Sequence, residues 1–222
     1  MSDLILGIDD AGRGPVIGPM VLAGCLIDKK TEEEFKSLGV RDSKQLTPRR
    51  REFLAEEIRK KSKAFEIVVV SPEEIDESKD KGIKLNELEA LAAAKIINKI
   101  NKGTKKIKVI LDCPSPNRTQ WRENLRIDIK NLSNLEVLCE HKADRDYIAV
   151  SAASILAKSE REKQMDKLKK KYGKEIGSGY TSDPKTKEFV AKNAKNHKGL
   201  FRKSWSTWKK AASKSKQKKL EF

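Results

Sequence analysis

The chain has 222 residues, and 49 lysines and arginines against 33 aspartates and glutamates give it a formal net charge of +16. No apolar run approaches the roughly 20 residues of a membrane-spanning helix, so the composition argues against an integral membrane protein. A basic excess of this size attracts polyanions, because each neutralised phosphate releases condensed counterions. Nucleic acid is therefore the favoured partner, although part of the excess lies in the last 14 residues and could reflect a basic tail.

The cysteines and the N-terminal residues indicate the cellular compartment. The three cysteines Cys25, Cys113 and Cys139 are an odd number without C-x-x-C spacing, which predicts no structural zinc and a reducing compartment. The chain runs directly into an apolar strand, without the layout of a signal peptide. We expect a soluble cytoplasmic protein, and nothing in the sequence demands more than a monomer.

The first predicted elements form a hairpin. The apolar run from Leu4 to Ile8 stops at Asp9-Asp10 and the segment 11–15, which predicts a buried strand ending in a tight turn. The run from Met20 to Ile27 is close enough to return beside it as an antiparallel neighbour. Thr47-Pro48 then opens a helix, with threonine as N-cap and proline in the first turn.

Strands and helices alternate along the rest of the chain. The predicted elements are strands at 64–70, 107–111 and 135–138, and helices at 84–101, 147–172, 184–196 and from about 206 into the tail. The small-residue run 149–154 should let the long helix approach its neighbours closely. This order predicts an α/β fold, with a mixed central sheet covered by helices and a C-terminal helical extension.

Aspartates stand where predicted strands end. Asp9 and Asp10 close the first strand and Asp112 closes a later one, while Asp144 precedes the long helix. Adjacent strand ends of an α/β sheet bring distant residues into one crevice, and oxygen ligands of this kind suit Mg²⁺ or Mn²⁺. An aspartate after a strand is also a common turn former or helix N-cap, so spacing alone leaves both interpretations open.

A glycine segment, Gly12-Arg13-Gly14, follows the first aspartate pair. Glycine permits positive φ and lets backbone groups approach a ligand without a Cβ in the way. The segment lacks the spacing and the lysine of a Walker A loop. It is compatible with a phosphate or sugar contact, and equally with a simple tight turn.

Taken together, these segments resemble the ribonuclease HII family, and its archaeal and eukaryotic branch in particular. The matching motifs run in family order across about 200 of the 222 residues: Gly-Ile-Asp-Asp-Ala-Gly-Arg-Gly at 7–14, Ile-Gly-Pro-Met at 17–20, Asp-Ser-Lys-x-Leu at 42–46, Asp112, His-Lys-Ala-Asp at 141–144, the helix start at 150–158, Gly-Ser-Gly-Tyr-Thr-Ser-Asp-Pro at 177–184, and Arg-x-Ser-Trp at 202–205. The resemblance implies a ribonuclease H-like catalytic domain at 1–183 and a helical extension with a basic tail at 184–222.

The resemblance also implies an activity. Members of the family hydrolyse the RNA strand of RNA/DNA hybrids and cut 5′ of ribonucleotides embedded in duplex DNA, leaving 5′-phosphate and 3′-hydroxyl ends. Four acidic residues hold two divalent cations, Mg²⁺ or Mn²⁺, and carry over to Asp9, Asp10, Asp112 and Asp144.

Ribose recognition carries over to a second set of residues. In the resemblance, Gly12, Arg13, Gly14 and Tyr180 read the 2′-hydroxyl, a group that both donates and accepts hydrogen bonds. Without the family match, Tyr180 would be interpreted as a half-buried packing residue. Two lysines, Lys44 and Lys158, resemble phosphate contacts.

One catalytic position departs from the family pattern. The family usually has glutamate at the second acidic position, where this chain has Asp10. The side chain is one methylene shorter, so its carboxylate must reach a metal by backbone adjustment or through water. We expect this change to affect the reaction rate or the metal preference.

The end of the chain allows one further partner. Residues Gln217 to Phe222 loosely resemble a peptide that binds the sliding clamp, although one aromatic is missing and the spacing is one residue short. An uninvolved basic helix end is the alternative.

Besides the endonuclease, two rival functions remain: a catalytically weak hybrid-binding protein, and another polynucleotidyl transferase on the same fold. The glycine segment and Tyr180 argue against the latter.

Overall fold

The structure is a computed structural model that describes residues 4–41, 46–197 and 199–217, with the backbone alone at 214–217. The chain forms two compact units. The first unit comprises Met1–Ala11, Val21–Val69 and Leu85–Glu160, and the second comprises Gly12–Met20, Val70–Lys84 and Arg161–Phe222. The boundary predicted at residue 183, which separates a catalytic domain from an extension, stays a prediction.

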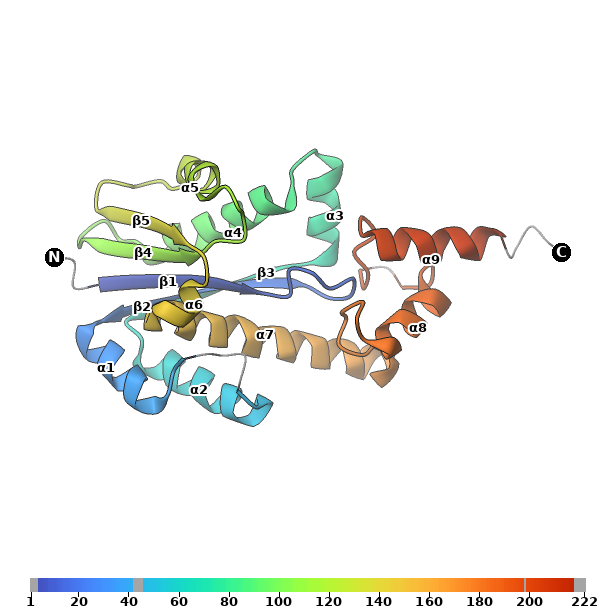
Figure 1. Cartoon of the computed structure of the whole chain (residues 1–222), viewed down its shortest axis with the longest axis horizontal. Helices are drawn as coiled ribbons and strands as arrows, with labels where there is room; N and C mark the ends of the chain where they lie inside the picture. Colours follow the sequence, from blue (N-terminus) through green and yellow to red (C-terminus); the bar gives the residue numbers. More distant parts are fainter. Residues whose placement is uncertain (1–3, 42–45, 198, 218–222) are drawn as a thin grey trace. The chain divides into compact units, whose positions relative to one another are not determined.

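A five-stranded mixed sheet forms the centre of the first unit (Figure 1). Its strands lie in the order β3-β2-β1-β4-β5, where β2 is antiparallel to β1, while β4 runs parallel to β1 and to β5. The bounds are β1 Leu4–Ala11, β2 Met20–Asp28, β3 Ala64–Val70, β4 Ile107–Asp112 and β5 Leu135–Glu140. The predicted hairpin and the α/β class are thus confirmed.

Helices cover both faces of this sheet (Figure 1). On one face lie α1 Lys29–Leu38, α2 Pro48–Lys61 and the start of α7 Ile148–Tyr172, and on the other lie α4 Leu85–Ile100 and α5 Arg118–Ile127. Buried apolar residues of β1 and β2 form one core with α1, α2 and α7. Burial of such residues is the main stabilising contribution to a layered fold.

The contact between β1 and α7 is unusually close because of Gly7. A Cβ on Gly7 would lie 2.1 Å from the carbonyl carbon of Ala149, a distance that no side chain allows. Ala149 begins the small-residue run that the sequence marked for close packing. Because successive side chains of a strand point to opposite faces, the contact of Gly7 with α7 determines which residues of β1 face α7 and which face the other side of the sheet.

Among the described residues, four α-helices were not predicted from the sequence, although three of them begin with a side-chain N-cap. Asp28 caps α1 by accepting a hydrogen bond from the amide of Thr31. The hydrogen bond from the Lys63 ammonium, followed by those from Thr31, holds the pKa of Asp28 well below its ordinary value. Ser71 and Glu74 form a capping box at the start of α3 Pro72–Asp80. Ser71-Pro72 directly follows the predicted strand at 64–70, after which no helix was predicted before residue 84.

Helices and loops make up the second unit. Besides α3 it contains the end of α7, a short 3₁₀ helix η1 Lys174–Ile176, α8 Pro184–Asn193 and α9 Ser206–Gln217. Its core joins Val16, Ile17, Phe189 and Phe201 to the C-terminal part of α7. The loop 12–20 is bonded into this core, since the amide of Gly18 donates to the carbonyl of Leu200 at 3.1 Å.

The helices and the cysteines of the structure concern two further predictions. In the described part of the chain, no helix is both long and apolar enough to cross a membrane. All three cysteines are buried and free of disulfide bonds. The cytoplasmic location itself stays a prediction.

Candidate active site

Asp9 and Asp10 lie inside β1, which extends to Ala11 and therefore further than the sequence predicted. Successive side chains of a strand point to opposite faces. Gly7 faces α7, so Asp9 shares the α7 face and Asp10 faces the other side. Asp9 is buried, with 7% of its surface exposed, and Ser154 of α7 hydrogen-bonds its carboxylate.

Asp112 is the last residue of the neighbouring strand. Ile8 pairs with Leu111, so Asp9 and Asp112 directly follow the last paired residues of two parallel strands. Asp112 has a fixed orientation, because its Oδ1 accepts a hydrogen bond from the amide of Ala143 at 2.9 Å. The parallel register places Asp112 on the same face of the sheet as Asp9.

Asp144 reaches this region through α6, a single turn spanning Ala143–Asp146. Lys142, which precedes it, is the one described non-glycine residue with positive φ, at 60°. This backbone bend turns the Ala143 amide toward Asp112 and leaves Asp144 buried, with 4% of its surface exposed. Backbone held in this region commonly marks a functional constraint.

The carboxylates disturb one another electrostatically. The pKa of Asp9 rises from 3.8 to about 8, mainly because burial disfavours its charge and then because Asp10 and Asp112 repel it. Among the described residues, no three His, Cys, Asp or Glu side chains already converge as a metal cluster. The donor set is nonetheless all oxygen and crowded with negative charge, which fits a hard divalent cation.

This raised pKa gives the first prediction. The folded chain keeps a proton on Asp9 that the unfolded chain, with a pKa of 3.8, has already released. The free energy of unfolding without metal should therefore fall as pH rises from about 4 to 8, by up to about 1.4 kcal/mol per pH unit. A divalent ion bound at Asp9 would have to displace this proton. Its stabilising shift in Tm should be small at pH 5.5 and large at pH 8.

The matched variant for this measurement is Asp9→Asn. It should be more stable than the wild type without metal at pH 8, and its Tm should respond little to added Mg²⁺ or Mn²⁺. An ion-induced shift of equal size at pH 5.5 and pH 8 in the wild type would contradict the assignment of the coupled proton to Asp9.

Lys158 is the one predicted phosphate contact that the structure describes. It lies on α7 four residues after Ser154, so both occupy the same side of the helix. That side carries the hydrogen bond to Asp9, and Lys158 is partly exposed. The other lysine, Lys44, lies outside the described residues.

In the second unit, two side chains hold the glycine segment by its carbonyl groups. Arg202 is completely buried, and its guanidinium donates to the carbonyls of Gly12, Arg13 and Gly18 at 2.6, 2.7 and 3.0 Å. The indole of Trp205 donates to the carbonyl of Gly14 at 3.1 Å. Three consecutive carbonyls of this segment are thus engaged inside the protein.

Gly12 and Gly14 differ in the space that surrounds the position of a Cβ atom. Gly12 has φ of 79°, and a Cβ there would lie 2.0 Å from Nε of Arg161, so protein packing alone demands glycine. A Cβ on Gly14 would meet nothing within 4 Å. The fold leaves space at Gly14 that a ligand can approach.

Tyr180 stands beside this segment within the same unit. The amides of Val16 and Ile17 donate to the carbonyl of Gly179 at 2.9 and 3.3 Å, which ties the tyrosine loop to the residues after the glycine segment. The Arg161 guanidinium lies 5.1 Å from the centre of the Tyr180 ring, a cation–π distance. Tyr180 itself keeps 41% of its surface exposed.

The predicted site residues therefore fall into two groups. Each group is assembled within one unit: the first unit holds Asp9, Asp10, Asp112, Asp144 and Lys158, and the second holds Gly12, Arg13, Gly14 and Tyr180. No role was predicted from the sequence for Ser154, Arg161, Arg202 or Trp205. A signal for Arg202 and Trp205 was present, because both belong to the Arg-x-Ser-Trp motif at 202–205.

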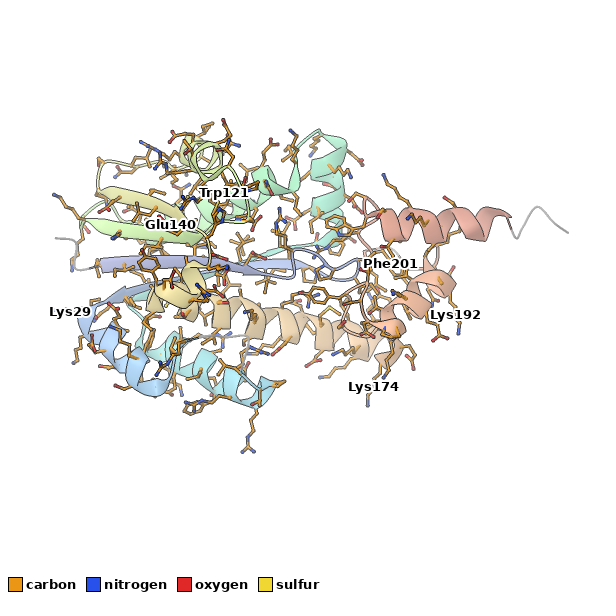
Figure 2. The ribbon with its side chains drawn as sticks, in the orientation of Figure 1. Lys29, Trp121, Glu140, Lys174, Lys192 and Phe201 are labelled. Carbon is orange, nitrogen blue, oxygen red and sulfur yellow. The ribbon has the colours of Figure 1, made fainter. Side chains whose placement is uncertain are left out.

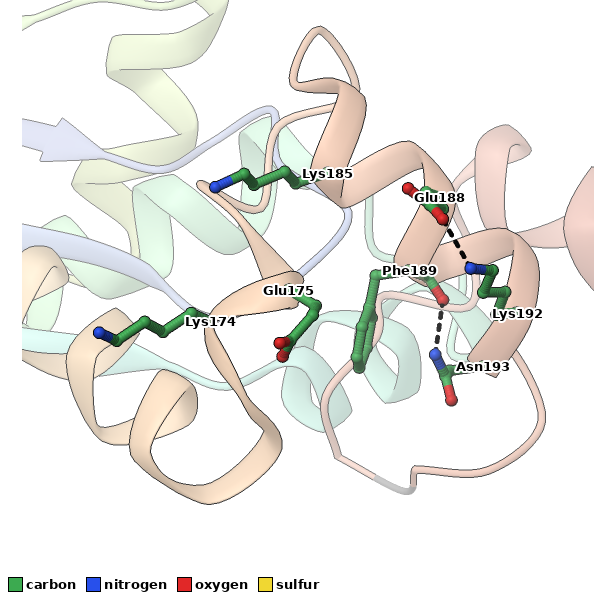
Figure 3. A pocket seen from close by; sticks show the side chains of 7 residues that line it. All are labelled: Lys174, Glu175, Lys185, Glu188, Phe189, Lys192 and Asn193. Carbon is green, nitrogen blue, oxygen red and sulfur yellow. Dashed lines mark hydrogen bonds and ion pairs between the residues drawn. The ribbon is translucent and has the colours of Figure 1, made fainter.

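A separate cavity in the second unit is not part of these groups. It has a volume of about 410 Å³ (Figure 3) and is lined by Lys174, Glu175, Lys185, Glu188, Phe189, Lys192 and Asn193. Lys192 and Glu188 form an ion pair at 2.6 Å. Figure 2 shows Lys174 and Lys192 projecting outward from the ribbon. None of the predicted site residues that the structure describes lines it.

A sequence model of the family described as Ribonuclease HII matches residues 6–208. The chain belongs to the ribonuclease HII family. It is accordingly a metal-dependent endoribonuclease that acts on RNA/DNA hybrids. Ribonuclease HII of Methanococcus maripaludis is 44% identical over 211 residues, which cover 93% of this chain and 86% of the relative. Ribonuclease HII of Methanocaldococcus jannaschii is 42% identical and covers 98% of both chains.

Solved structures agree with this assignment. The crystal structure of ribonuclease H2 from Pyrococcus horikoshii is 37% identical and superposes with a TM-score of 0.86, over 96% of this chain and 99% of the other. Ribonuclease HII of Archaeoglobus fulgidus, solved in complex with PCNA, is 38% identical with a TM-score of 0.80, over 93% and 94%. The predicted family and fold are thus confirmed.

Proposed function

We propose that this ribonuclease HII family member cuts on the 5′ side of ribonucleotides embedded in duplex DNA, as well as within the RNA strand of hybrids, and leaves 5′-phosphate and 3′-hydroxyl ends. The observation that carries the proposal is that Asp9 and Asp112 directly follow the last paired residues of two adjacent parallel strands, on one face of the sheet. The glycine segment begins only two residues after Asp10 along the chain.

The acidic residues are proposed to hold two divalent ions, Mg²⁺ or Mn²⁺. Asp9, Asp10, Asp112 and Asp144 supply oxygen donors for them. When bound, the ions supply Lewis acidity, which makes a water more acidic and neutralises charge on the leaving 3′ oxygen. The Ala143 amide fixes the rotamer of Asp112, and Ser154 holds the carboxylate of Asp9. Fixed carboxylates lower the reorganisation that the reaction would otherwise require.

Ribose recognition is proposed to come from the second unit. The engaged carbonyls of Gly12, Arg13 and Gly14 orient their peptide planes, and the open side of Gly14 admits a sugar. The exposed ring of Tyr180, held by Arg161, is suited to pack on the adjoining sugar. Lys44 and Lys158 are proposed phosphate contacts, which add affinity without sequence preference.

The experiment is cleavage of a duplex that carries one ribonucleotide, with the cut position mapped, and with Mg²⁺, Mn²⁺ or neither. We expect one cut on the 5′ side of the ribonucleotide, and only with a divalent ion. Tight binding without cleavage would instead favour the second candidate, a catalytically weak hybrid-binding protein. That alternative is motivated by Asp10 and by the net charge of +16.

Asp10→Glu is the variant that tests the departure from the family pattern. Asp10 faces away from the sheet face that Asp9 presents, so one more methylene should help its carboxylate reach an ion. We expect kcat to be retained or to rise by up to about tenfold, at both Mg²⁺ and Mn²⁺. A large loss of kcat would mean that the site is built around the shorter acid.

The sliding clamp is a proposed partner. The Archaeoglobus fulgidus relative was solved as a PCNA:RNase HII complex, and the clamp-like tail of this chain, Gln217 to Phe222, lies outside the described residues apart from the backbone of Gln217. Removing these residues should abolish binding to an archaeal clamp and leave cleavage of a short duplex unchanged. Clamp binding that survives the truncation would assign it elsewhere.

A further inference from the structure

Asp76 of α3 makes an unusual contact with the C-terminal part of the second unit. Its Oδ2 accepts a hydrogen bond from the amide of Lys203 at 2.8 Å, and its Oδ1 accepts one from the amide of Ser204 at 2.9 Å. Both oxygens of one carboxylate therefore hold two consecutive peptide groups. Hydrogen bonds to a charged acceptor are roughly twice as strong as neutral ones.

These two amides belong to the two central residues of a tight turn. The turn runs from Arg202 to Trp205 and is closed by the Trp205 amide, which donates to the carbonyl of Arg202 at 3.1 Å. Its first and last residues are the ones whose side chains engage the glycine-segment carbonyls. The turn is thus held on one side by Asp76 and on the other by the glycine segment.

The helix that carries Asp76 is itself firmly placed. Its capping box fixes its start, Ile75 is buried with 3% of its surface exposed, and Lys79 donates to the carbonyl of Ser204 at 3.4 Å. A cavity of about 630 Å³ lies here, lined on α3 also by Glu77 and Asp80. Among the described residues, no other carboxylate of α3 accepts a hydrogen bond from the turn amides. Asp76 therefore differs from the other acidic residues of α3 in its hydrogen-bond geometry and not only in its charge.

We propose that Asp76 is a positioning residue for ribose discrimination. The inference rests on the proposed function, in which the glycine segment reads the 2′-hydroxyl. Asp76 fixes the turn, the turn fixes Arg202 and Trp205, and these fix the peptide planes of Gly12 to Gly14. The carboxylate touches no substrate and no reacting atom in this scheme.

The experiment compares Asp76→Asn with Asp80→Asn, the same substitution at an exposed position of the same helix. The readout is the discrimination ratio, which is Kd for an all-DNA duplex divided by Kd for that duplex with one ribonucleotide, measured with Ca²⁺ to prevent turnover. We expect Asp76→Asn to lower this ratio about three- to tenfold while Kd for all-DNA duplex stays unchanged. Asp80→Asn should leave both values unchanged.

General damage to the fold would reduce the active fraction for both duplexes and would not move the ratio. Amide hydrogen exchange gives a second measurement: residues 12–14 and 203–204 should exchange faster in Asp76→Asn than in Asp80→Asn. A wild-type ratio near one would overturn the proposed ribose reading, and this inference with it. If the wild type discriminates but Asp76→Asn keeps both the ratio and the exchange rates, Asp76 has no positioning role.

Discussion

Asp112→Asn is expected to lower kcat for hybrid cleavage by at least about 10³-fold while the Kd for the hybrid changes less than about threefold. Asparagine keeps an Oδ1 that can accept the hydrogen bond from the Ala143 amide, so the strand end and α6 should keep their positions. It removes the negative charge that we propose holds a divalent ion. Binding to the phosphate backbone does not depend on that charge.

Glu140→Gln is the matched control for this variant. Glu140 ends β5, pairs with Asp112 across the sheet and is drawn in Figure 2. Its carboxylate is committed to an ion pair with Arg118 at 2.7 Å at the surface. Removing this exposed charge should change kcat less than about twofold. If both variants kept wild-type turnover, Asp112 would not belong to the catalytic centre.

The sequence was sufficient for the sheet and for the strand-end acids because both depend on local patterns. Short apolar runs such as Leu4 to Ile8 mark buried strands, and neighbouring parallel strands carry the residues that follow these runs to the same edge of the sheet. The parallel pairing of β1 with β4 places Asp9 level with Asp112. The length of β1 was underestimated, since strand pairing with β2 continues through Asp10 and Ala11.

What the sequence could not provide is the set of contacts between side chains and distant backbone. Arg202 engages carbonyls about 190 positions earlier in the chain, and no periodicity encodes such a pairing. The same holds for Asp76, which bonds amides 127 and 128 positions away. The αL conformation of Lys142 is likewise invisible in composition, because lysine has no preference for positive φ.

Arg202→Lys is expected to be the most damaging change outside the acidic residues. Lysine keeps the positive charge, but its single ammonium group cannot donate to the carbonyls of Gly12, Arg13 and Gly18 together. Buried carbonyls left without donors cost about 1–3 kcal/mol each, so the free energy of unfolding should fall by about 3 kcal/mol. A glycine segment displaced by about 1 Å should lower kcat on the order of 10²-fold for a duplex with one ribonucleotide.

Lys203→Gln is the control, because it removes a neighbouring exposed charge and keeps the backbone amide that Asp76 holds. Its stability and kcat should stay close to those of the wild type. The acidic residues belong to the first unit, so Arg202→Lys should still show the Tm shift on adding Mn²⁺ at pH 8. Loss of that shift as well would mean that Arg202 supports the acidic centre, not only the glycine segment. Retention of the shift together with a lost discrimination ratio would separate the proposed ribose reading from the proposed metal binding, whose residues belong to different units.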